Sequence, residues 1–340
     1  MLCRLWRQAS VAAVLIFPRA TTVAFAALPP THKTSVIKNL STVGTGATSL
    51  SATGTTTNGM ESKIEAATPV NGIPGQDIKE EQPVRNPITE SSTVLVVGGG
   101  RGIGLEFVHQ CAGRGATVIA THRGSDISTD LKTFMDDTRY NIEALSLDVG
   151  DEESIANAAK ELKARLGDRP LTHVIHSAGT YMKGMSFDGT SRGGRPPQPV
   201  VTKEDMMTTY LVNAVGPLLV AQAFAPLMGP APGSDEKHLP VYSILTSKVG
   251  SVYDNTSGGT YAYRSSKSAL NNIAKSLSVD LAGEASVVLL HPGFVRTDMT
   301  GGKGLIDTPE SVSGMLRAVE TTDATVGFRF VDFKACIIPW

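Results

Sequence analysis

Short aliphatic runs alternate with amphipathic stretches along the chain from about residue 92 onward. Runs of four to six apolar residues bounded by glycine or polar residues are typical of buried strands, and apolar residues at three- and four-residue spacing indicate helices. Strands are predicted over residues 93–97, 116–120, 142–147, 171–176, 241–245 and 286–290, with a seventh in the tail at 327–331. Helices are predicted over residues 103–113, 129–138, 151–166, 203–227, 259–281 and 309–321.

Strict alternation of strands and helices determines the expected fold class. A helix between two successive parallel strands makes a right-handed crossover, and a series of such crossovers builds an α/β doubly wound parallel sheet covered by helices on both faces. This is the Rossmann fold, here expected as a single domain over residues 92–340. Ligands of such sheets bind beyond the carboxyl ends of the strands, so the residues that follow each strand are the first candidates for a site.

The N-terminal part has a different composition. Residues 1–60 contain arginine and lysine but no acidic residue, the apolar stretch at 11–17 is too short to span a bilayer, and residues 41–59 are rich in Ser, Thr and Gly. These features predict a disordered targeting extension over 1–60, followed by a linker over 61–91. Residues 23–29, Val-Ala-Phe-Ala-Ala-Leu-Pro, resemble the signal–transit junction of proteins imported into complex algal plastids. We therefore expect a plastid location, with the mitochondrion or the secretory route as alternatives.

Overall composition excludes several functions. The formal net charge is -1, so nothing in the charge balance favours nucleic acid or an anionic membrane as a partner. The three cysteines have no metal-ligand spacing and do not suggest a disulfide framework, which favours a reducing compartment. His109, His173 and His291 have no matching metal ligands and are expected to be structural. No stable membrane span is predicted.

A glycine cluster lies between the first predicted strand and the first predicted helix. Gly98, Gly102 and Gly104 allow the backbone to turn sharply and to approach a pyrophosphate, while Ile103 begins a helix whose N-terminal N–H groups bind anions. The second strand is followed by Arg123 and by no carboxylate. An acidic residue there would bind the ribose hydroxyl of NAD, whereas arginines pair with a 2′-phosphate. NADPH is therefore the expected cofactor, with Arg123 and Arg101 as phosphate ligands.

A tyrosine and a lysine four residues apart lie on the helix after the fifth strand. Tyr263 and Lys267 share one helix face at this spacing. A neighbouring ammonium stabilises a phenolate and lowers its pKa, which makes a tyrosine useful in acid–base catalysis. Ser247 follows the fifth strand directly, where its hydroxyl can hydrogen-bond a substrate carbonyl.

The order of these motifs from about residue 93 to residue 340 resembles the classical short-chain dehydrogenase/reductase family. The strings at 261–271, 291–299 and 338–340 resemble the sniffer-like carbonyl reductases within it. The resemblance implies a catalytic tetrad of Asn213, Ser247, Tyr263 and Lys267. It implies, together with the reasoning above, cofactor contacts from Gly98, Arg101, Gly102, Ile103, Gly104, Arg123, Asp148, Val149, Ala178, Gly179, Tyr263, Lys267, Pro292, Gly293, Val295 and Thr297.

The implied reaction is reduction of an aldehyde or ketone to an alcohol. Ser247 and Tyr263 would bind the carbonyl oxygen, NADPH would deliver hydride, and Tyr263 would donate the proton. Lys267 would lower the pKa of Tyr263 and bond the nicotinamide ribose, while Asn213 would hold a water that relays protons. Relatives commonly form homo-dimers or homo-tetramers. A plastid reductase of 3-oxoacyl-carrier-protein substrates or of pigments is the alternative, and a non-catalytic dinucleotide-binding scaffold is less favoured.

Two positions depart from the family pattern. Val97 replaces the threonine usual at the head of the glycine motif, which removes a hydroxyl and its hydrogen bonds. His176-Ser177-Ala178-Gly179 replaces Asn-Asn-Ala-Gly after the fourth strand, which puts the usual hydrogen bonds there in doubt. The polar loops at 182–200 and 230–238 are expected to be surface insertions, and a substrate lid at 182–200 is the alternative.

Overall fold

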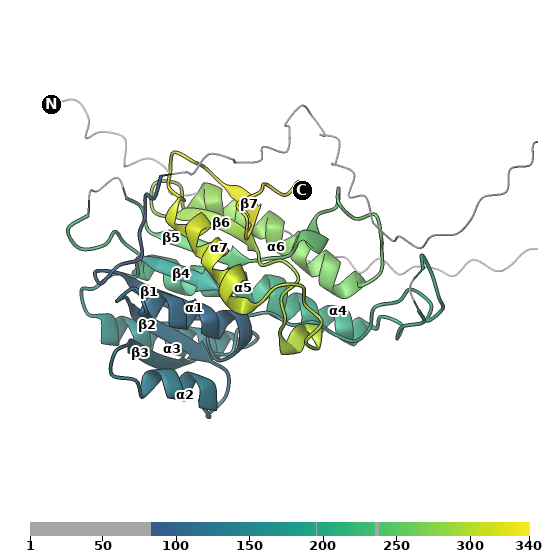
Figure 1. The fold of residues 1–340 in the computed structure, drawn as a ribbon, viewed down its shortest axis with the longest axis horizontal. Coiled ribbons are helices and arrows are strands. Elements are labelled where there is room, and N and C mark those ends of the chain that lie inside the picture. Colours follow the sequence, from purple (N-terminus) through teal and green to yellow (C-terminus); the bar gives the residue numbers. More distant parts are fainter. Residues whose placement is uncertain (1–82, 195, 235–237) are drawn as a thin grey trace, which may run out of the picture. The chain divides into compact units, whose positions relative to one another are not determined.

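The fold is a single seven-stranded sheet with helices on both faces, in a computed structural model that describes residues 83–194, 196–234 and 238–340. The strand order is β3-β2-β1-β4-β5-β6-β7 and all six pairings are parallel, so the labels in Figure 1 run from β3 at the bottom to β7 at the top. The strands are β1 (Thr93–Val97), β2 (Thr117–His122), β3 (Asn141–Ser146), β4 (His173–His176), β5 (Val241–Leu245), β6 (Ser286–His291) and β7 (Arg329–Asp332).

The helices are α1 (Gly102–Ala112), α2 (Thr129–Met135), α3 (Glu152–Leu166), α4 (Lys203–Tyr210), α5 (Gly216–Phe224), α6 (Tyr261–Asp280) and α7 (Thr308–Glu320). Side chains alternate across each strand, so every strand contributes to two cores. On one face, Leu95 and Val97 pack with residues of α3, α5 and α6; on the other, Val94 and Val96 pack with residues of α1, α2 and α7. This arrangement confirms the predicted doubly wound parallel sheet.

The predicted long helix over 203–227 is interrupted in the structure. A π-helical turn, Leu211–Val215, separates α4 from α5, and the N–H of Gly216 bonds to the carbonyl of Leu211. Two residues explain the break. A Cβ on Gly216 would lie 2.4 Å from the carbonyl oxygen of Val149, and Pro217 has no N–H to donate to the carbonyl of Asn213. The periodicity of the apolar residues continues through this turn and therefore does not reveal it.

The described part of the predicted linker packs on the domain. Ile88 is buried in the core on the α1 and α7 side, and the side-chain amide of Asn86 donates to the carbonyl of Thr322 at 2.5 Å. Arg85 pairs with Asp323 at 3.0 Å. Residues 85–88 therefore belong to the folded domain, which begins before residue 92. The sequence does not reveal this boundary, because a single buried side chain and a few long-range bonds leave no periodic pattern. The predicted extension and the rest of the linker, residues 1–82, lie outside the described residues.

One helical stretch in the described part of the chain, Lys203–Leu227, is long and apolar enough to cross a membrane by length and composition. In this fold the stretch covers the sheet, and Val220, Ala221 and Phe224 are buried in its core.

Candidate active site

The glycine loop after β1 is built by contacts that exclude side chains. Gly98 has a φ of 82°, and a Cβ there would lie 2.9 Å from the backbone of Ala178. A Cβ on Gly104 would lie 2.0 Å from the carbonyl oxygen of Gly98. Both positions therefore require glycine, and the loop after β4 lies directly against the loop after β1. The structure thus brings together Gly98, Gly104 and Ala178, three of the predicted cofactor ligands.

The N-terminus of α1 is open to a ligand. Its N-cap residue, Arg101, makes no side-chain capping hydrogen bond, so the first-turn N–H groups have no side-chain acceptor. Gly102 follows with a φ of 55°, and the methyl of Thr297 lies 3.8 Å from where a Cβ on Gly102 would be. The loop after β6 therefore reaches the N-terminus of α1. Uncapped N–H groups and the helix dipole suit a phosphate group at this position.

Thr121 holds the glycine loop in place and was missed by the sequence analysis. Its hydroxyl accepts the N–H of Gly98 at 2.9 Å, and its carbonyl accepts the N–H of Gly99 at 2.9 Å. Ser128 bonds the carbonyl of Gly100 at 2.6 Å through its hydroxyl. These bonds come from β2 and from the loop after it, so a loop headed by Val97 still has a hydroxyl partner. The available signal was a threonine directly after the aliphatic run Val118-Ile119-Ala120.

The two arginines predicted to bind phosphate are both exposed beside this loop. Arg123 directly follows β2, and Gly100 lies near His122, the last residue of that strand. Arg101 is 3.9 Å from Asp298, in a pair whose side chains are 79% and 88% exposed. An ion pair this exposed contributes little energy, so the guanidinium of Arg101 is available to another anion.

The remaining predicted cofactor ligands follow β3 and β6. Asp148 accepts the N–H of Gly150 at 2.9 Å, and the neighbouring carbonyl of Val149 lies against Gly216 at the start of α5.

The loop after β6 holds the other predicted cofactor ligands. Gly293 has a φ of 83° with the ring of Phe333 beside it. Further along this loop, the carbonyl of Pro292 accepts the Ser311 hydroxyl, Val295 bridges to Ile306, and Thr297 caps a short turn at 298–300. All these residues follow carboxyl ends of strands, as expected.

Tyr263 lies in the first turn of α6 and is hydrogen-bonded to Ser247, which follows β5. Burial raises the pKa of Tyr263 to about 12, and the bond from Ser247 opposes part of that rise. The four-residue spacing of Tyr263 and Lys267 predicts instead that the ammonium lowers this pKa. The Lys267 Nζ is 5.9 Å from the centre of the Tyr263 ring, and the cost of burying a phenolate is larger than this attraction.

Lys267 is buried one turn further along α6. Its Nζ donates to the carbonyl of Leu245 at 3.0 Å, and burial lowers the pKa of the ammonium to about 8. A Cβ on Gly250 would lie 2.8 Å from the Cβ of Lys267, so the turn after Ser247 packs directly on this residue. Ser247, Tyr263 and Lys267 therefore meet at the carboxyl end of β5.

Asn213 lies in the π-helical turn and is fully buried. Its side-chain oxygen accepts the N–H of Thr180 at 2.8 Å, and its side-chain nitrogen donates to the carbonyl of Thr180 at 2.9 Å and to Ser266 at 3.2 Å. A Cβ on Gly179 would be 3.4 Å from the Asn213 oxygen and 3.7 Å from the Lys267 nitrogen. Asn213 therefore fixes the loop after β4 next to Lys267.

Tyr181, in the same loop, packs on the edge of the Tyr263 ring and was not predicted. The ring centres of Tyr181 and Tyr263 are 4.9 Å apart at 64°, and the Tyr181 hydroxyl bonds the sulfur of Met185. The carbonyl of Met185 accepts the N–H of Thr260, which directly precedes α6 and has a φ of 46°. The loop after β4 is thus tied to the start of α6. No motif in the sequence connects these segments.

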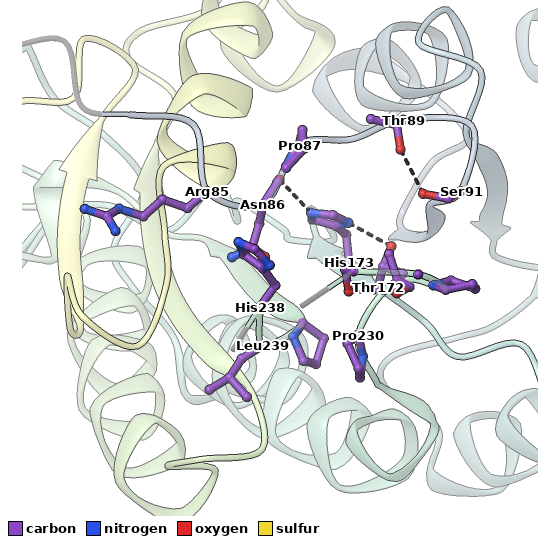
Figure 2. A pocket seen from close by; sticks show the side chains of 15 residues that line it. Arg85, Asn86, Pro87, Thr89, Ser91, Thr172, His173, Pro230, His238 and Leu239 are labelled. Carbon is purple, nitrogen blue, oxygen red and sulfur yellow. Dashed lines mark hydrogen bonds between the residues drawn. The ribbon is translucent and has the colours of Figure 1, made fainter. Parts of the chain in front are cut away.

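A cavity of about 260 Å³ lies elsewhere, at the amino ends of β4 and β5. Figure 2 shows His173 within it, hydrogen-bonded to the Thr172 hydroxyl and to the Asn86 carbonyl. None of the predicted site residues lines it. The bonds of His173 agree with a structural role. Within the described ranges, no group of three or more His, Cys, Asp or Glu side chains could hold a metal ion.

The chain matches a known protein family over most of its length. A family model described as short chain dehydrogenase matches residues 92–305. A 1-hydroxy-2-glutathionyl-2-methyl-3-butene dehydrogenase of Rhodococcus sp. (strain AD45) is 31% identical over 259 residues, which are 73% of this chain and 100% of that protein.

The solved structures that are similar to the chain include two carbonyl reductases. One is an NADPH-bound carbonyl reductase from chicken fatty liver, with a TM-score of 0.64 and 28% identity over 73% of this chain and 98% of that one. The other is the carbonyl reductase Sniffer of D. melanogaster, with a TM-score of 0.64 and 27% identity over 74% and 99%.

Proposed function

The chain belongs to the short-chain dehydrogenase family, and we propose that it is an NADPH-dependent carbonyl reductase that converts an aldehyde or ketone to an alcohol. The observation that carries the proposal is the meeting of Ser247, Tyr263 and Lys267 at the carboxyl end of β5, on the side of the sheet where the glycine loop also lies. The resemblance to carbonyl reductases supports the reaction class.

The residues present fit the cofactor. Gly98 and Gly102 have left-handed backbone conformations, and the uncapped start of α1 offers N–H donors to a pyrophosphate. Arg101 and Arg123 would bind the 2′-phosphate, because guanidinium groups pair with phosphate oxygens in a bidentate way. The contact between Thr297 and Gly102 would hold the nicotinamide end between the loops after β1 and β6. When bound, NADPH supplies the hydride that reduces the carbonyl carbon.

The proton chemistry is assigned to the three side chains. Because the pKa of Tyr263 is raised to about 12, its phenol keeps its proton at neutral pH and can donate that proton to the oxygen of the reduced substrate. The Ser247 hydroxyl holds the same oxygen in place. Lys267, whose pKa is about 8, is mostly an ammonium at pH 7 and stabilises the phenolate left behind. Asn213 acts on Thr180 and so keeps the loop after β4 against this centre.

Other enzymes of the same family are the alternative. A reductase of 3-oxoacyl-carrier-protein substrates or of pigments would use the same residues with a different substrate loop. A non-catalytic dinucleotide-binding scaffold is less favoured, because both Tyr263 and Lys267 are present and buried together.

The experiment is a turnover assay of the full chain. NADPH oxidation is measured across a panel of aldehydes, quinones and acyl-thioester ketones. The Tyr263→Phe variant should lose about 100-fold or more of kcat while its affinity for NADPH stays within about twofold, because it removes the proton donor and only one of the many predicted cofactor contacts. Preference for acyl-thioester ketones would favour the carrier-protein alternative. NADPH binding without consumption across the panel would favour the scaffold, and an active Tyr263→Phe variant would disprove the assignment of the donor.

We also propose an oligomeric state and a cellular location for the protein. A homo-dimer or homo-tetramer is supported by an exposed apolar stripe along α4 and the π-helical turn, formed by Met207, Leu211 and Val215; a monomeric mass in light scattering would contradict it. Import into a plastid is supported by the acid-free composition of residues 1–60. Location of a fluorescent fusion of the full chain outside the plastid would reject it.

A further inference from the structure

His176, the last residue of β4, is buried without a hydrogen bond. It is 0% exposed, and neither ring nitrogen has a hydrogen-bond partner in the described part of the chain. Buried polar side chains almost always have partners, because an unpaired buried donor or acceptor costs free energy. His291, at the end of β6, has an unpartnered buried nitrogen too, but only at Nδ1. The imidazole of His176 therefore needs an explanation.

The strand geometry directs His176 toward the catalytic helix. Side chains two residues apart on a strand share a face, and Val174 packs in the core cluster that contains residues of α6. His176 also pairs across the sheet with Ile244 of β5, and the next carbonyl of that strand, Leu245, accepts the Lys267 ammonium at 3.0 Å. The imidazole and the ammonium thus lie at adjacent strand ends on one face of the sheet.

Lys267 has few partners for a buried ammonium. An ammonium has three N–H donors, and the described structure provides one acceptor for them, the carbonyl of Leu245. No salt bridge to Lys267 is formed by a carboxylate of the described residues. The phenol of Tyr263 lies beside it, and Tyr181 packs on the Tyr263 ring. The turn packed against α6 adds the ammonium of Lys248, which pairs with Asp254 at 3.5 Å. In the described part of the chain, none of these side chains accepts a hydrogen bond from Lys267.

The imidazole of His176 is suited to accept from this ammonium. Burial and, to a smaller extent, the charge of Lys267 together lower the pKa of His176 to about 3. The ring is therefore neutral at every pH at which a reductase works, and a neutral imidazole has one nitrogen with a free lone pair. An internal water between two polar groups is a common way to satisfy both.

We propose that His176 is a positioning residue that keeps Lys267 protonated, by accepting a hydrogen bond from the ammonium through one internal water. The proposal rests on the proposed reductase function, in which Lys267 must carry its charge to stabilise the phenolate of Tyr263. It also gives a role to a histidine where the family pattern has asparagine: both side chains offer a neutral acceptor at the same strand end.

The test compares an apolar variant with a polar one. His176→Leu removes the acceptor, and His176→Asn restores one. A hydrogen bond to a charged group changes a pKa by about one unit or more, so the high-pH limb of kcat/KM should move down by about one pH unit in His176→Leu and return in His176→Asn. At a pH one unit above the wild-type limb, His176→Leu should lose about tenfold in kcat/KM. His291→Leu, at the other buried strand-end imidazole, should leave the limb in place.

A second measurement does not depend on turnover. Titration of the Lys267 amine by NMR in the ¹⁵N-lysine-labelled apo protein, with Lys267→Met to assign the signal, should show the same downward shift in His176→Leu. If His176→Leu does not fold, His176→Met provides the apolar variant. An unmoved lysine titration in a folded apolar variant, or no rescue by His176→Asn, would overturn the inference. If the lysine titration shifts in His176→Leu but the wild-type protein reduces no carbonyl, the proposed function alone would be overturned.

Discussion

Replacing Asn213 by leucine tests how the π-helical turn supports the site. The substitution keeps a similar volume but removes the three hydrogen bonds to Thr180 N, Thr180 O and Ser266 Oγ. Two of the lost partners are backbone groups of Thr180 in a partly buried loop, and each unsatisfied group costs about 1–3 kcal/mol. Because Thr180 is not fully buried, water reaches it in part, and we expect a loss of about 3 kcal/mol in the free energy of unfolding.

The assay is urea unfolding of the full chain, followed by steady-state kinetics. A loss of about 3 kcal/mol corresponds to a fall of about 6–12 °C in Tm for a domain of this size. We also expect kcat to fall by about 10- to 100-fold, because the loop that packs Tyr181 against Tyr263 loses its anchor. Asn272→Leu is the matched control: Asn272 is exposed on α6 and should change stability by less than about 0.5 kcal/mol.

If Asn213→Leu unfolds at the same urea concentration as the wild type, the three hydrogen bonds do not hold the loop. If stability falls as expected but kcat is unchanged, the bonds stabilise the fold and do not position the site.

Two further predictions concern charge. Arg123→Asp should lower the ratio of kcat/KM for NADPH to kcat/KM for NADH by about 100-fold. The new carboxylate repels the 2′-phosphate of NADPH and accepts a hydrogen bond from the ribose hydroxyl of NADH. An unchanged ratio would reject the phosphate role of Arg123. Lys267→Met should raise the free energy of unfolding at pH 7 by about 1–3 kcal/mol while abolishing turnover. The pKa of the Lys267 ammonium is about 8 in the folded protein, below its value of about 10 in the unfolded chain. Burial of the charged side chain therefore destabilises the wild type below pH 8. The stability gained by Lys267→Met should vanish as the pH rises above about 10, where the lysine is neutral in both states. Unfolding curves at both pH values check the sign, and a variant less stable than the wild type at pH 7 would contradict it.

Local patterns in the chain were sufficient to predict the order of strands and helices, the doubly wound sheet and the glycine loop. The aliphatic runs, the spacing of Gly98, Gly102 and Gly104, and the four-residue spacing of Tyr263 and Lys267 are all set by neighbouring residues. Strand-end residues were candidates for the same reason, because parallel strands bring their carboxyl ends to one edge. Ser247, Tyr263 and Lys267 were singled out by their places after the fifth strand, whereas Asn213 was assigned only through the resemblance to the family.

Tertiary structure decided the features that join distant segments. Thr121 and Tyr181 act on residues of other loops, and the break at Asn213 arises where Gly216 meets the carbonyl of Val149. The pKa of Tyr263 is a further case. The spacing of the residues predicts one attractive charge beside the phenol, that of Lys267. The direction of the pKa shift depends instead on how completely the phenol is removed from water. Burial is a property of the whole fold, so spacing along the chain could predict which groups meet but not which of their protonation states is favoured.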